Sequence, residues 1–311
     1  MFTRDHIHSI IPEPAGRVQS PASDEIKQAD QGSHEHESHE NRPVEAAHDV
    51  VVDHKSDVIQ KPEVTNFKTA REGIESLMKY IRSPNASACG NPVLVGGPLD
   101  RKGDGVWTVC ADRILRDGQP CVVYSFGICN DFSFDDEMNL KGCEVHSFDP
   151  SMGVESYSRS KTHWFHDAGI SGIDDSNYTD HRSSMLGKGV KPWVVKTIPS
   201  WMSTLSHNHI SLLKVDVEYC EWDALNQLLK SPDIQNIDQI IFEVHFWPGR
   251  RSNPEAVSVL DAVQSWMDVL ITIEKAGFQH FSTHENPMSS GEVIDEYHYP
   301  CCFEVGYVRS F

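Results

Sequence analysis

Three features that mark common functional classes are missing from the sequence. Its 311 residues include no run of 18 or more apolar residues, so no helix is expected to span a bilayer. Its eight cysteines form no CxxC pair, which argues against a zinc ribbon. Basic residues number 27 against 46 acidic ones, a net charge of −19, so the chain has little of the positive charge that binds nucleic acid.

Residues 1–65 have too few apolar side chains to build a core. They contain one aromatic residue, Phe2, and their 13 acidic and 6 basic residues leave a net charge of −7. Burial of so little apolar surface would not offset about 1–2 kcal/mol of backbone entropy per ordered residue. We therefore predict a disordered acidic and His-rich tail over 1–65 and one domain over 66–311, with a helical and turn-rich lead-in at 66–118 and a core at 119–311.

Three histidines of the tail, His34, His36 and His39, are interspersed with glutamates. Imidazoles bind transition metals well, so one hypothesis is a weak metal site. The other hypothesis, which the low-complexity composition favours, is a solvated polar segment. We predict no metal ligand among the candidate site residues of the domain that follows.

The cysteine positions allow more than one redox state. Cys121 and Cys143 lie in strongly apolar segments, which predicts small buried thiols. Cys89 and Cys110 are candidates for a disulfide in an oxidising compartment, and their spacing alone does not decide the matter.

Strand and helix patterns alternate along residues 66–311. Apolar runs of strand length occur over 106–109, 121–126, 143–148, 162–166, 210–217, 239–246, 278–283 and 303–308. Helical spacing of apolar residues occurs over 67–81, 132–140, 221–229 and 257–276, and residues 193–205 fit a short strand and a helix. The alternation indicates an α/β fold with a mostly parallel sheet covered on both faces, and the last two strands form an antiparallel hairpin.

Polar residues follow two early strands at the sheet edge where such folds bind ligands. Gly127 ends the first, and a glycine there lets a ligand approach the backbone closely. With a single glycine this turn does not satisfy GxGxxG, and the alternative is a plain strand–helix turn. Asp149 ends the next strand, where an acid can accept hydrogen bonds from the two hydroxyls of a ribose. Its alternative role is to cap the turn before Pro150.

Two later strands end in further ionisable residues. Asp216 and Glu218 alternate with valines, which predicts that both carboxylates face one side at the end of a buried strand. Glu218 and Glu221 can instead lie in the first turn of the next helix, where acids are favoured. Glu243 and His245 share a face of the following strand, and histidine is the usual proton-transfer group near neutral pH. The alternative for His245 is a structural histidine with satisfied hydrogen bonds.

Several segments occur in a recognisable order. They are CVVYSFGICNDFSFDDEM, GCEVHSFDPSM, HWFHDAGISG, LLKVDVEYCEW and IIFEVHFWPG, followed by Asn286-Pro287 and CCFEVGYV. In this combination, over residues 88–311, the chain resembles the animal methyltransferase-like 24 group, which is related to the FkbM-type S-adenosylmethionine-dependent methyltransferases. SFDPS and KVDVE are the most specific elements of the resemblance.

The resemblance implies a class I methyltransferase fold. This is a Rossmann-like sheet of about seven strands, mostly parallel with an antiparallel C-terminal hairpin, and with helices on both faces. It also implies that Ser125, Phe126 and Gly127 hold the methionine part of S-adenosylmethionine, and that Asp149 holds the ribose hydroxyls.

Further residues correspond to the family's site by position. Ile170 and Ser171 are expected near the adenine, and Asp216 beside the methionine amine or the reacting centre, with Glu218 next to it. The family pattern VDxEGAEW is changed here, because Tyr219-Cys220 replaces Gly-Ala. That replacement puts bulk where the following helix starts.

We expect from this resemblance an S-adenosylmethionine-dependent methyltransferase that methylates an oxygen of a small molecule or glycan. The enzyme would position the acceptor and remove its proton, with His245, Asp216 or Glu218 as the base. The alternative is a catalytically inactive protein of the same fold that serves as a binding module, and an NAD-dependent dehydrogenase would need a richer glycine pattern. Family members follow the secretory route, whereas the opening MFTRDHIHSIIPEP shows no secretory signal.

Overall fold

The computed structural model of the chain describes residues 66–114, 120–179, 192–248, 258–286 and 289–310. All of them belong to one compact unit, Ile59–Phe311. The tail predicted over 1–65 lies outside the described residues, so its disorder and its boundary with the domain stay predictions.

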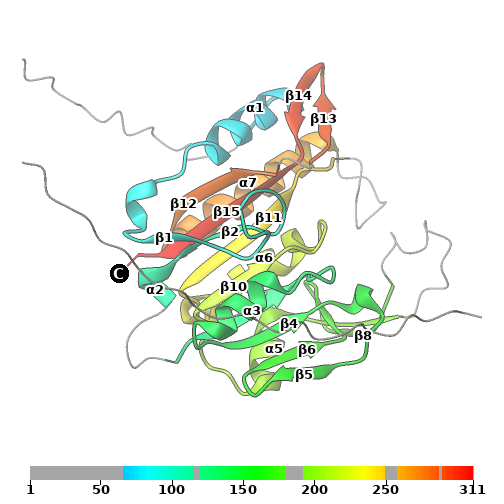
Figure 1. Cartoon of the computed structure of the whole chain (residues 1–311). Helices are drawn as coiled ribbons and strands as arrows, with labels where there is room; N and C mark the ends of the chain where they lie inside the picture. Colours follow the sequence, from blue (N-terminus) through cyan, green and yellow to red (C-terminus); the bar gives the residue numbers. More distant parts are fainter. Residues whose placement is uncertain (1–65, 115–119, 180–191, 249–257, 287–288, 311) are drawn as a thin grey trace, which may run out of the picture. The chain divides into compact units, whose positions relative to one another are not determined.

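An eight-stranded sheet forms the centre of this unit, in the order β12-β15-β11-β10-β3-β4-β6-β5 (Figure 1). Its strands are β3 (Val122–Phe126), β4 (Glu144–Phe148), β5 (Tyr157–Ser160), β6 (His163–His166), β10 (Leu212–Val215), β11 (Gln239–His245), β12 (Phe278–Glu285) and β15 (Cys302–Arg309). β15 runs antiparallel to both β11 and β12, while the strands from β11 to β6 are parallel. This order confirms the predicted class I methyltransferase fold, with its antiparallel strand near the C-terminus.

Alternation along the central strands separates two apolar cores. Tyr124 and Leu213 face one core, which includes the buried sides of four helices, whereas Val123 and Leu212 face the other. The helices on the first face are α1 (Ala70–Ile81), α5 (Ile198–Leu205), α6 (Glu221–Leu229) and α7 (Val259–Lys275), and α3 (Ser133–Leu140) covers the second. Every residue of β3, β10 and β11 is buried, as expected of strands covered on both faces.

Three smaller sheets and several short helices surround the central sheet. The smaller sheets are β1 (Pro92–Val95) with β2 (Trp107–Cys110), β13 (Gly291–Ile294) with β14 (Tyr297–Pro300), and β7 (Gly169–Ile170) with β9 (Trp193–Lys196) and β8 (Asp175–Tyr178). The short helices are α2 (Ala111–Ile114), η1 (Ala86–Ala88), η2 (Pro150–Met152) and η3 (Pro232–Asn236). No helix within the described ranges combines the length and apolar character needed to cross a membrane.

Two parts of the topology differ from the prediction. β12 and β15 are adjacent and antiparallel as expected, but the β13–β14 hairpin lies between them in the sequence. β5 adds an eighth strand at the sheet edge, and its sequence Tyr-Ser-Arg-Ser has no apolar run because most of its residues are exposed. Strand prediction from apolar runs misses such edge strands.

Three disulfides join six of the eight cysteines, as Cys89–Cys110, Cys121–Cys143 and Cys301–Cys302. The prediction of buried thiols at Cys121 and Cys143 is therefore wrong. These residues directly precede the paired strands β3 and β4, and the strand register brings their Cα atoms to 4.6 Å. Sequence separation did not reveal this proximity because it depends on which strands are neighbours.

We predict that alkylation of the unfolded, unreduced protein modifies two cysteines, Cys129 and Cys220, which take no part in the disulfides. After reduction all eight react. Intact-mass spectrometry and peptide mapping measure both numbers. Labelling of Cys121 or Cys143 before reduction would restore the thiol interpretation.

Candidate functional site

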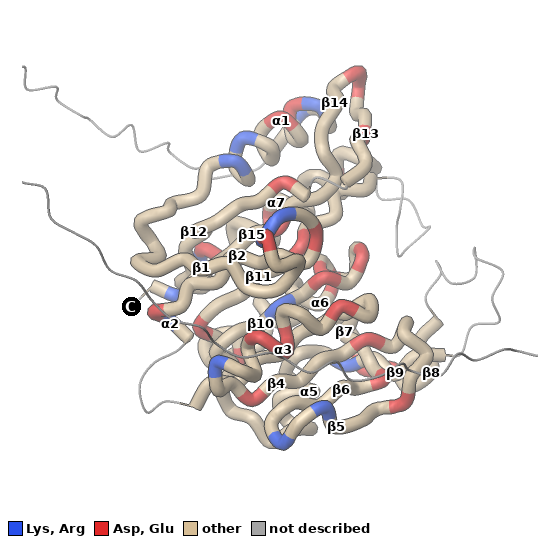
Figure 2. Tube along the Cα trace, viewed as in Figure 1, with Lys and Arg blue, Asp and Glu red and all other residues tan. Residues whose placement is uncertain are grey.

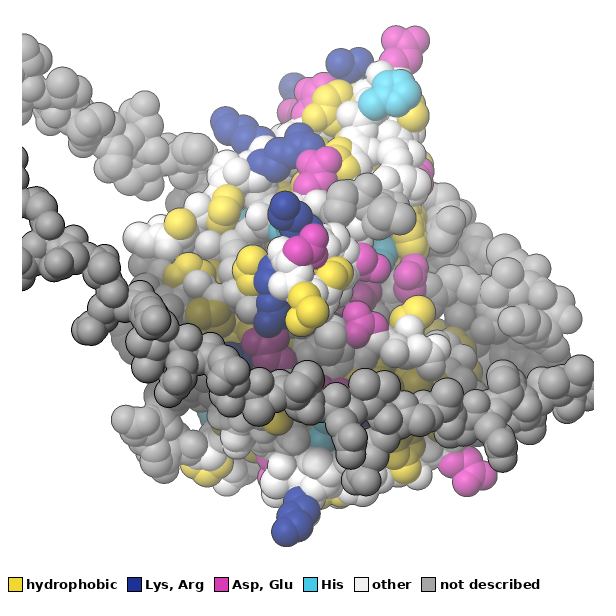
Figure 3. All heavy atoms as spheres, viewed as in Figure 1, with side chains coloured by type: hydrophobic (Ala, Val, Ile, Leu, Met, Phe, Trp, Pro, Cys, Tyr) yellow, Lys and Arg dark blue, Asp and Glu magenta, His cyan; other side chains and the backbone are white. Residues whose placement is uncertain are grey.

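A cleft of about 970 Å³ opens at the carboxyl ends of β3, β4, β10 and β11. The sheet order reverses between β3 and β10, and such a switch point is where open α/β sheets bind their ligands. Acidic positions gather around α3, α6, β7 and β10 (Figure 2). The space-filling view shows acidic side chains at the centre of the same face, near the loop that joins β1 to β2 (Figure 3). The acidic residues that line the cleft are Asp104, Asp131, Asp149, Asp216, Glu218 and Glu243.

Gly127 brings the ends of β3 and β10 into backbone contact. Its φ is +82°, and a Cβ built there would lie 1.6 Å from the carbonyl oxygen of Asp216. The Lys214 ammonium donates a hydrogen bond of 2.9 Å to the Gly127 carbonyl. A side chain is thus excluded at Gly127 by the protein's own backbone, in addition to any ligand that approaches the turn.

Asp149 connects the turn that follows β3 to the turn that follows β4 through hydrogen bonds. Its Oδ2 accepts hydrogen bonds from the backbone N–H groups of Ile128 and Cys129, at 2.9 and 2.8 Å. Its Oδ1 accepts from the Ser151 N–H at 2.8 Å and from the Ser151 hydroxyl at 2.6 Å. The capping role considered from the sequence is therefore present, since Asp149 is the N-cap of η2. A ribose hydroxyl would have to replace the Ser151 hydroxyl, which is the one donor of the four that can rotate away.

The sequence-predicted cofactor residues divide into two groups. Gly127, Asp149, Ile170 and Asp216 line the cleft. The other three lie behind it and do not line it, and they are Ser125, Phe126 and Ser171.

The residues of this second group have other packing partners. The Phe126 ring stacks on Phe148, with 4.4 Å between ring centroids, and the Ser171 N–H donates to the Lys196 carbonyl. Ser125 is fully buried within β3. These three residues are neighbours in sequence of residues that line the cleft, but this did not reveal that their own side chains face the interior.

The candidate bases Asp216 and Glu218 do not share a strand face as predicted. β10 ends at Val215, and the positive φ angles of Glu218 (+56°) and Tyr219 (+91°) turn the chain sharply before α6. The Glu218 side chain is 56% exposed. Such φ values favour glycine, so Tyr219 occupies a backbone conformation that is costly for a side-chain-bearing residue.

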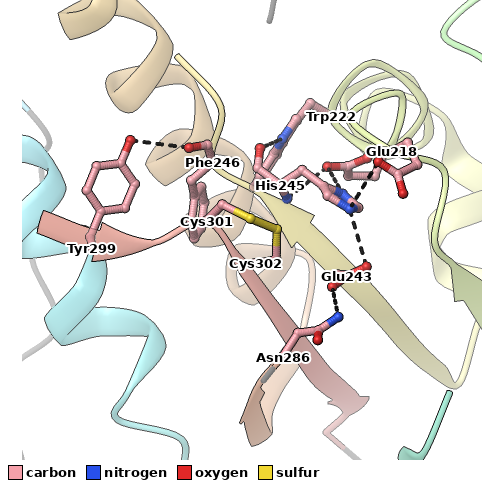
Figure 4. The surroundings of a disulfide bond; sticks show 10 residues. Glu218, Trp222, Glu243, His245, Phe246, Asn286, Tyr299, Cys301 and Cys302 are labelled. Carbon is pink, nitrogen blue, oxygen red and sulfur yellow. Dashed lines mark hydrogen bonds and ion pairs between the residues drawn. A yellow bond between two sulfur atoms is a disulfide. The ribbon is translucent and has the colours of Figure 1, made fainter. Parts of the chain in front are cut away.

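His245 lies between two carboxylates and is 2% exposed (Figure 4). Its Nδ1 is 3.1 Å from Glu221 Oε1, and its Nε2 is 3.2 Å from Glu243 Oε2. Burial acts to lower the pKa of His245, but the charges and hydrogen bonds of Glu221 and Glu243 outweigh it and hold the pKa well above its ordinary value. His245 is therefore a buried imidazolium at neutral pH, with both nitrogens engaged.

The neighbouring carboxyl groups of Asp216 and Glu243 have pKa values that are shifted in opposite directions. Burial raises the pKa of Asp216 to about 7, and the negative charge of Glu243 adds to the increase. Burial also opposes ionisation of Glu243, but hydrogen bonds from His245 and Asn286 lower its pKa to about 2. Glu243 is thus ionised near neutral pH, while Asp216 exchanges a proton there.

Three residues of this network were absent from the predicted site, namely Lys214, Glu221 and Glu243. A lysine within the apolar run LLKVD is a detectable signal, because a buried charge needs a partner. Lys214 is 4% exposed and lies 4.7 Å from the Trp107 ring. Glu243 was already placed on the same strand face as His245 by the sequence but was given no role, whereas the contact of Glu221 with His245 depends on how α6 packs on β11.

The Cys301–Cys302 disulfide lies beside this network (Figure 4). The Cys302 sulfur is within 4.8 Å of a Glu243 oxygen and a His245 nitrogen. Because the sulfur is bonded to Cys301, it is not available as a thiolate ligand, and the disulfide forms part of the cleft wall.

The chain is similar to known methyltransferase sequences. Residues 55–300 match a family model described as a methyltransferase domain. Two curated relatives, each named "Probable methyltransferase-like protein 24", are 29% (Rattus norvegicus) and 28% (Homo sapiens) identical over 216 residues. These matches cover 66% of this chain and 56% of each relative, so the chain corresponds to little more than half of the relatives' length.

Similarity to solved structures is weaker. A structure described as a "putative S-adenosylmethionine dependent methyltransferase" from Listeria monocytogenes is 13% identical, with a TM-score of 0.31. The alignment covers 64% of this chain and 96% of that one.

We predict that Gly127→Ala lowers the free energy of unfolding by about 2 kcal/mol more than Gly142→Ala does. Both glycines have a φ that strains alanine, by about 1–3 kcal/mol. Only at Gly127 does the new Cβ meet backbone, whereas nothing lies within 4 Å of it at Gly142. Urea denaturation measures the difference, and equal losses in the two variants would contradict the close contact with Asp216.

We predict that His245→Ala lowers the free energy of unfolding at pH 7 by about 3–5 kcal/mol, because it leaves buried carboxylates without their cation. The loss narrows as the pH falls below the ordinary carboxylate pKa toward about 2, where Glu243 is protonated in the unchanged protein as well and no longer needs a cation. His209→Ala is the matched control, because His209 also pairs with a carboxylate, Asp238, at 3.1 Å but is 42% exposed. Its loss is expected to be at most about 1 kcal/mol. Equal losses in both variants would show that His245 is not the charge that neutralises the network.

Proposed function

The chain belongs to the methyltransferase domain family, and we propose that it transfers the methyl group of S-adenosylmethionine to an oxygen of a small molecule or glycan. The observation that carries this proposal is Asp216, an acid with a pKa near 7 that lines a cleft at the sheet's switch point. A general base works best when its pKa lies close to the working pH.

The residues of the cleft fit S-adenosylmethionine. Its volume of about 970 Å³ leaves room for a cofactor and an acceptor together. We propose that the Gly127 turn lies against the methionine part, that Asp149 accepts from a ribose hydroxyl in place of Ser151, and that Ile170 packs near the adenine. Bound there, the cofactor supplies an electrophilic methyl group on a sulfonium.

Asp216 is the base that this geometry favours among the three candidates. His245 already carries a proton and has carboxylates at both nitrogens, so it is a poor acceptor for another. Glu218 is 56% exposed and lies 3.9 Å from His245, which makes it an electrostatic neighbour rather than a buried base. His245 then acts indirectly, because it keeps Glu243 ionised, and the charge of Glu243 helps to raise the pKa of Asp216 while the charge of His245 itself lowers it.

The lining of the cleft favours a neutral acceptor rich in hydroxyl groups. Aromatic side chains line it, and they are Trp107, Tyr178, Trp193 and Trp247. Acids line it as well, including Asp104 and Asp131. Aromatic faces pack against apolar faces of a sugar, and carboxylates accept hydrogen bonds from its hydroxyls. An anionic acceptor would be repelled, so a hydroxyl is favoured over a carboxylate as the methylated group.

The inactive binding module remains the second candidate, on two observations. Tyr219 occupies a φ of +91° where the family pattern has glycine, and Asp149 already has four hydrogen-bond donors. Both features weaken cofactor binding relative to a site built without them. Cofactor binding without turnover is the outcome that this second candidate requires.

We also propose that the protein resides in an oxidising compartment. Its three disulfides persist where thiols are not kept reduced, which agrees with the secretory route implied by the family resemblance.

We predict that Asp216→Asn lowers the rate of methyl transfer by about 10²–10⁴-fold, because the amide cannot accept the acceptor's proton. In the unchanged protein the rate rises with pH through about 7, as Asp216 loses its proton, and this rise is absent from the variant. Release of S-adenosylhomocysteine with a panel of hydroxyl acceptors measures the rate. Glu218→Gln is the comparison, and its rate is expected to change less than tenfold.

Calorimetry with S-adenosylmethionine accompanies these assays. Asp216→Asn should still bind the cofactor, which would show that its site is folded. Absence of binding to the unchanged protein at millimolar cofactor would refute the proposed function. Binding without S-adenosylhomocysteine release from any acceptor would favour the inactive binding module.

A further inference from the structure

A second group of ionisable side chains lies at the amino-terminal ends of the sheet strands, whereas the cleft opens at their carboxyl ends. Glu144 begins β4, whose other end leads to Asp149, and His146 is two residues further along the same strand. His207 follows α5. The Nε2 atoms of His146 and His207 both lie 3.1 Å from the same oxygen, Glu144 Oε1.

Each imidazole is oriented through its other nitrogen. His146 Nδ1 lies 2.9 Å from His166 Nε2, and His207 Nδ1 lies 2.8 Å from the Tyr124 hydroxyl. Both partners can either donate or accept a hydrogen bond, so each ring can carry its proton on Nδ1 and present a lone pair at Nε2. Metal-bound histidines use outer partners of this kind to fix their ring orientation and tautomer.

The separations suit a tetrahedral cation. Zn²⁺ bound by two imidazole nitrogens and a carboxylate oxygen, at about 2.0–2.2 Å each, holds its ligand atoms roughly 3.3–3.5 Å apart. The observed Nε2–Oε1 distances of 3.1 Å need only a small expansion to reach these values. The side chains of His146 and His207 are 6% and 15% exposed and that of Glu144 is 39% exposed, so one side of the group is open to water.

Two other groups of ligand-type side chains occur within the described ranges. Each of them depends on cysteine sulfur, from Cys89 and Cys110 in one case and from Cys302 in the other. These sulfurs are bonded in disulfides and cannot act as thiolates. The group of Glu144, His146 and His207 is the one whose three donor atoms are all available.

We propose that Glu144, His146 and His207 bind Zn²⁺, with water at the fourth position. The ion joins β4 to the segment that follows α5, and it stabilises the amino-terminal edge of the sheet. Its position at the edge remote from the cleft gives it a structural role, separate from methyl transfer.

The test uses the full chain, with the seven tail histidines changed to alanine so that the tail offers no competing imidazoles. These are His6, His8, His34, His36, His39, His48 and His54. Calorimetric titration with Zn²⁺ should show one ion bound per chain, and the melting temperature should rise with Zn²⁺ concentration. His207→Ala is expected to weaken Zn²⁺ binding by at least about tenfold, which is the scale of loss for even an outer partner of a metal ligand. His209→Ala is the matched control and should bind as the parent does, since His209 pairs with Asp238 outside the group.

Glu144→Gln provides a second variant in case His207→Ala does not fold, and it should also lose at least about tenfold in affinity. Circular dichroism of each variant without metal reports whether it is folded. The proposal is overturned if the parent binds no Zn²⁺, if His209→Ala loses as much affinity as the ligand variants, or if Glu144→Gln binds unchanged. Measurements of methyl transfer are independent of these outcomes.

Discussion

The backbone contact between Gly127 and Asp216 is the constraint on which the site depends. It brings the ends of two neighbouring parallel strands together at the point where the strand order reverses. Several hydrogen bonds surround this contact. The Gly127 N–H donates to Phe148 O, and Lys214 donates to Gly127 O. Asp149 accepts hydrogen bonds from the next two N–H groups of the turn. A β-carbon at Gly127 would separate the strand ends and disturb all of these hydrogen bonds together.

Charge is distributed in the cleft so that neighbouring acids behave differently. The imidazolium of His245 lies between Glu221 and Glu243, and its hydrogen bond and charge help to keep Glu243 ionised despite burial. Asp216 has Glu243 as a neighbour, so the same arrangement discourages its ionisation. Glu304, opposite Glu243 on β15, has a pKa raised to about 9 by burial and by Glu243, and it is neutral at physiological pH. His245 thereby keeps Glu243 charged, whereas burial and the charge of Glu243 leave Asp216 able to exchange a proton.

The carboxyl and amino ends of the parallel strands carry different kinds of residues. At the carboxyl ends, single residues that follow each strand converge on an open cleft, as in other open α/β folds. At the amino ends of β3 and β4, the Cys121–Cys143 disulfide joins the two strands, and Glu144, which follows Cys143, contacts both His146 and His207. The disulfide and the histidine group therefore hold the amino ends of the strands together without occupying the cleft in which a ligand would bind.

The sequence alone determined the order of the buried strands of the central sheet and of the longer helices, because burial on one or both faces leaves a local pattern of apolar residues. It also placed Gly127, Asp149, Ile170 and Asp216 at strand ends that do line the cleft. Only the tertiary structure decided which cysteines are paired, that β5 extends the sheet, and that His245 is held as a cation. Each of these depends on residues distant in sequence, such as Glu221 on α6. A disulfide requires two cysteines within bonding distance, and a pKa is set by the charges and burial around a group, so neither can be deduced from a local pattern.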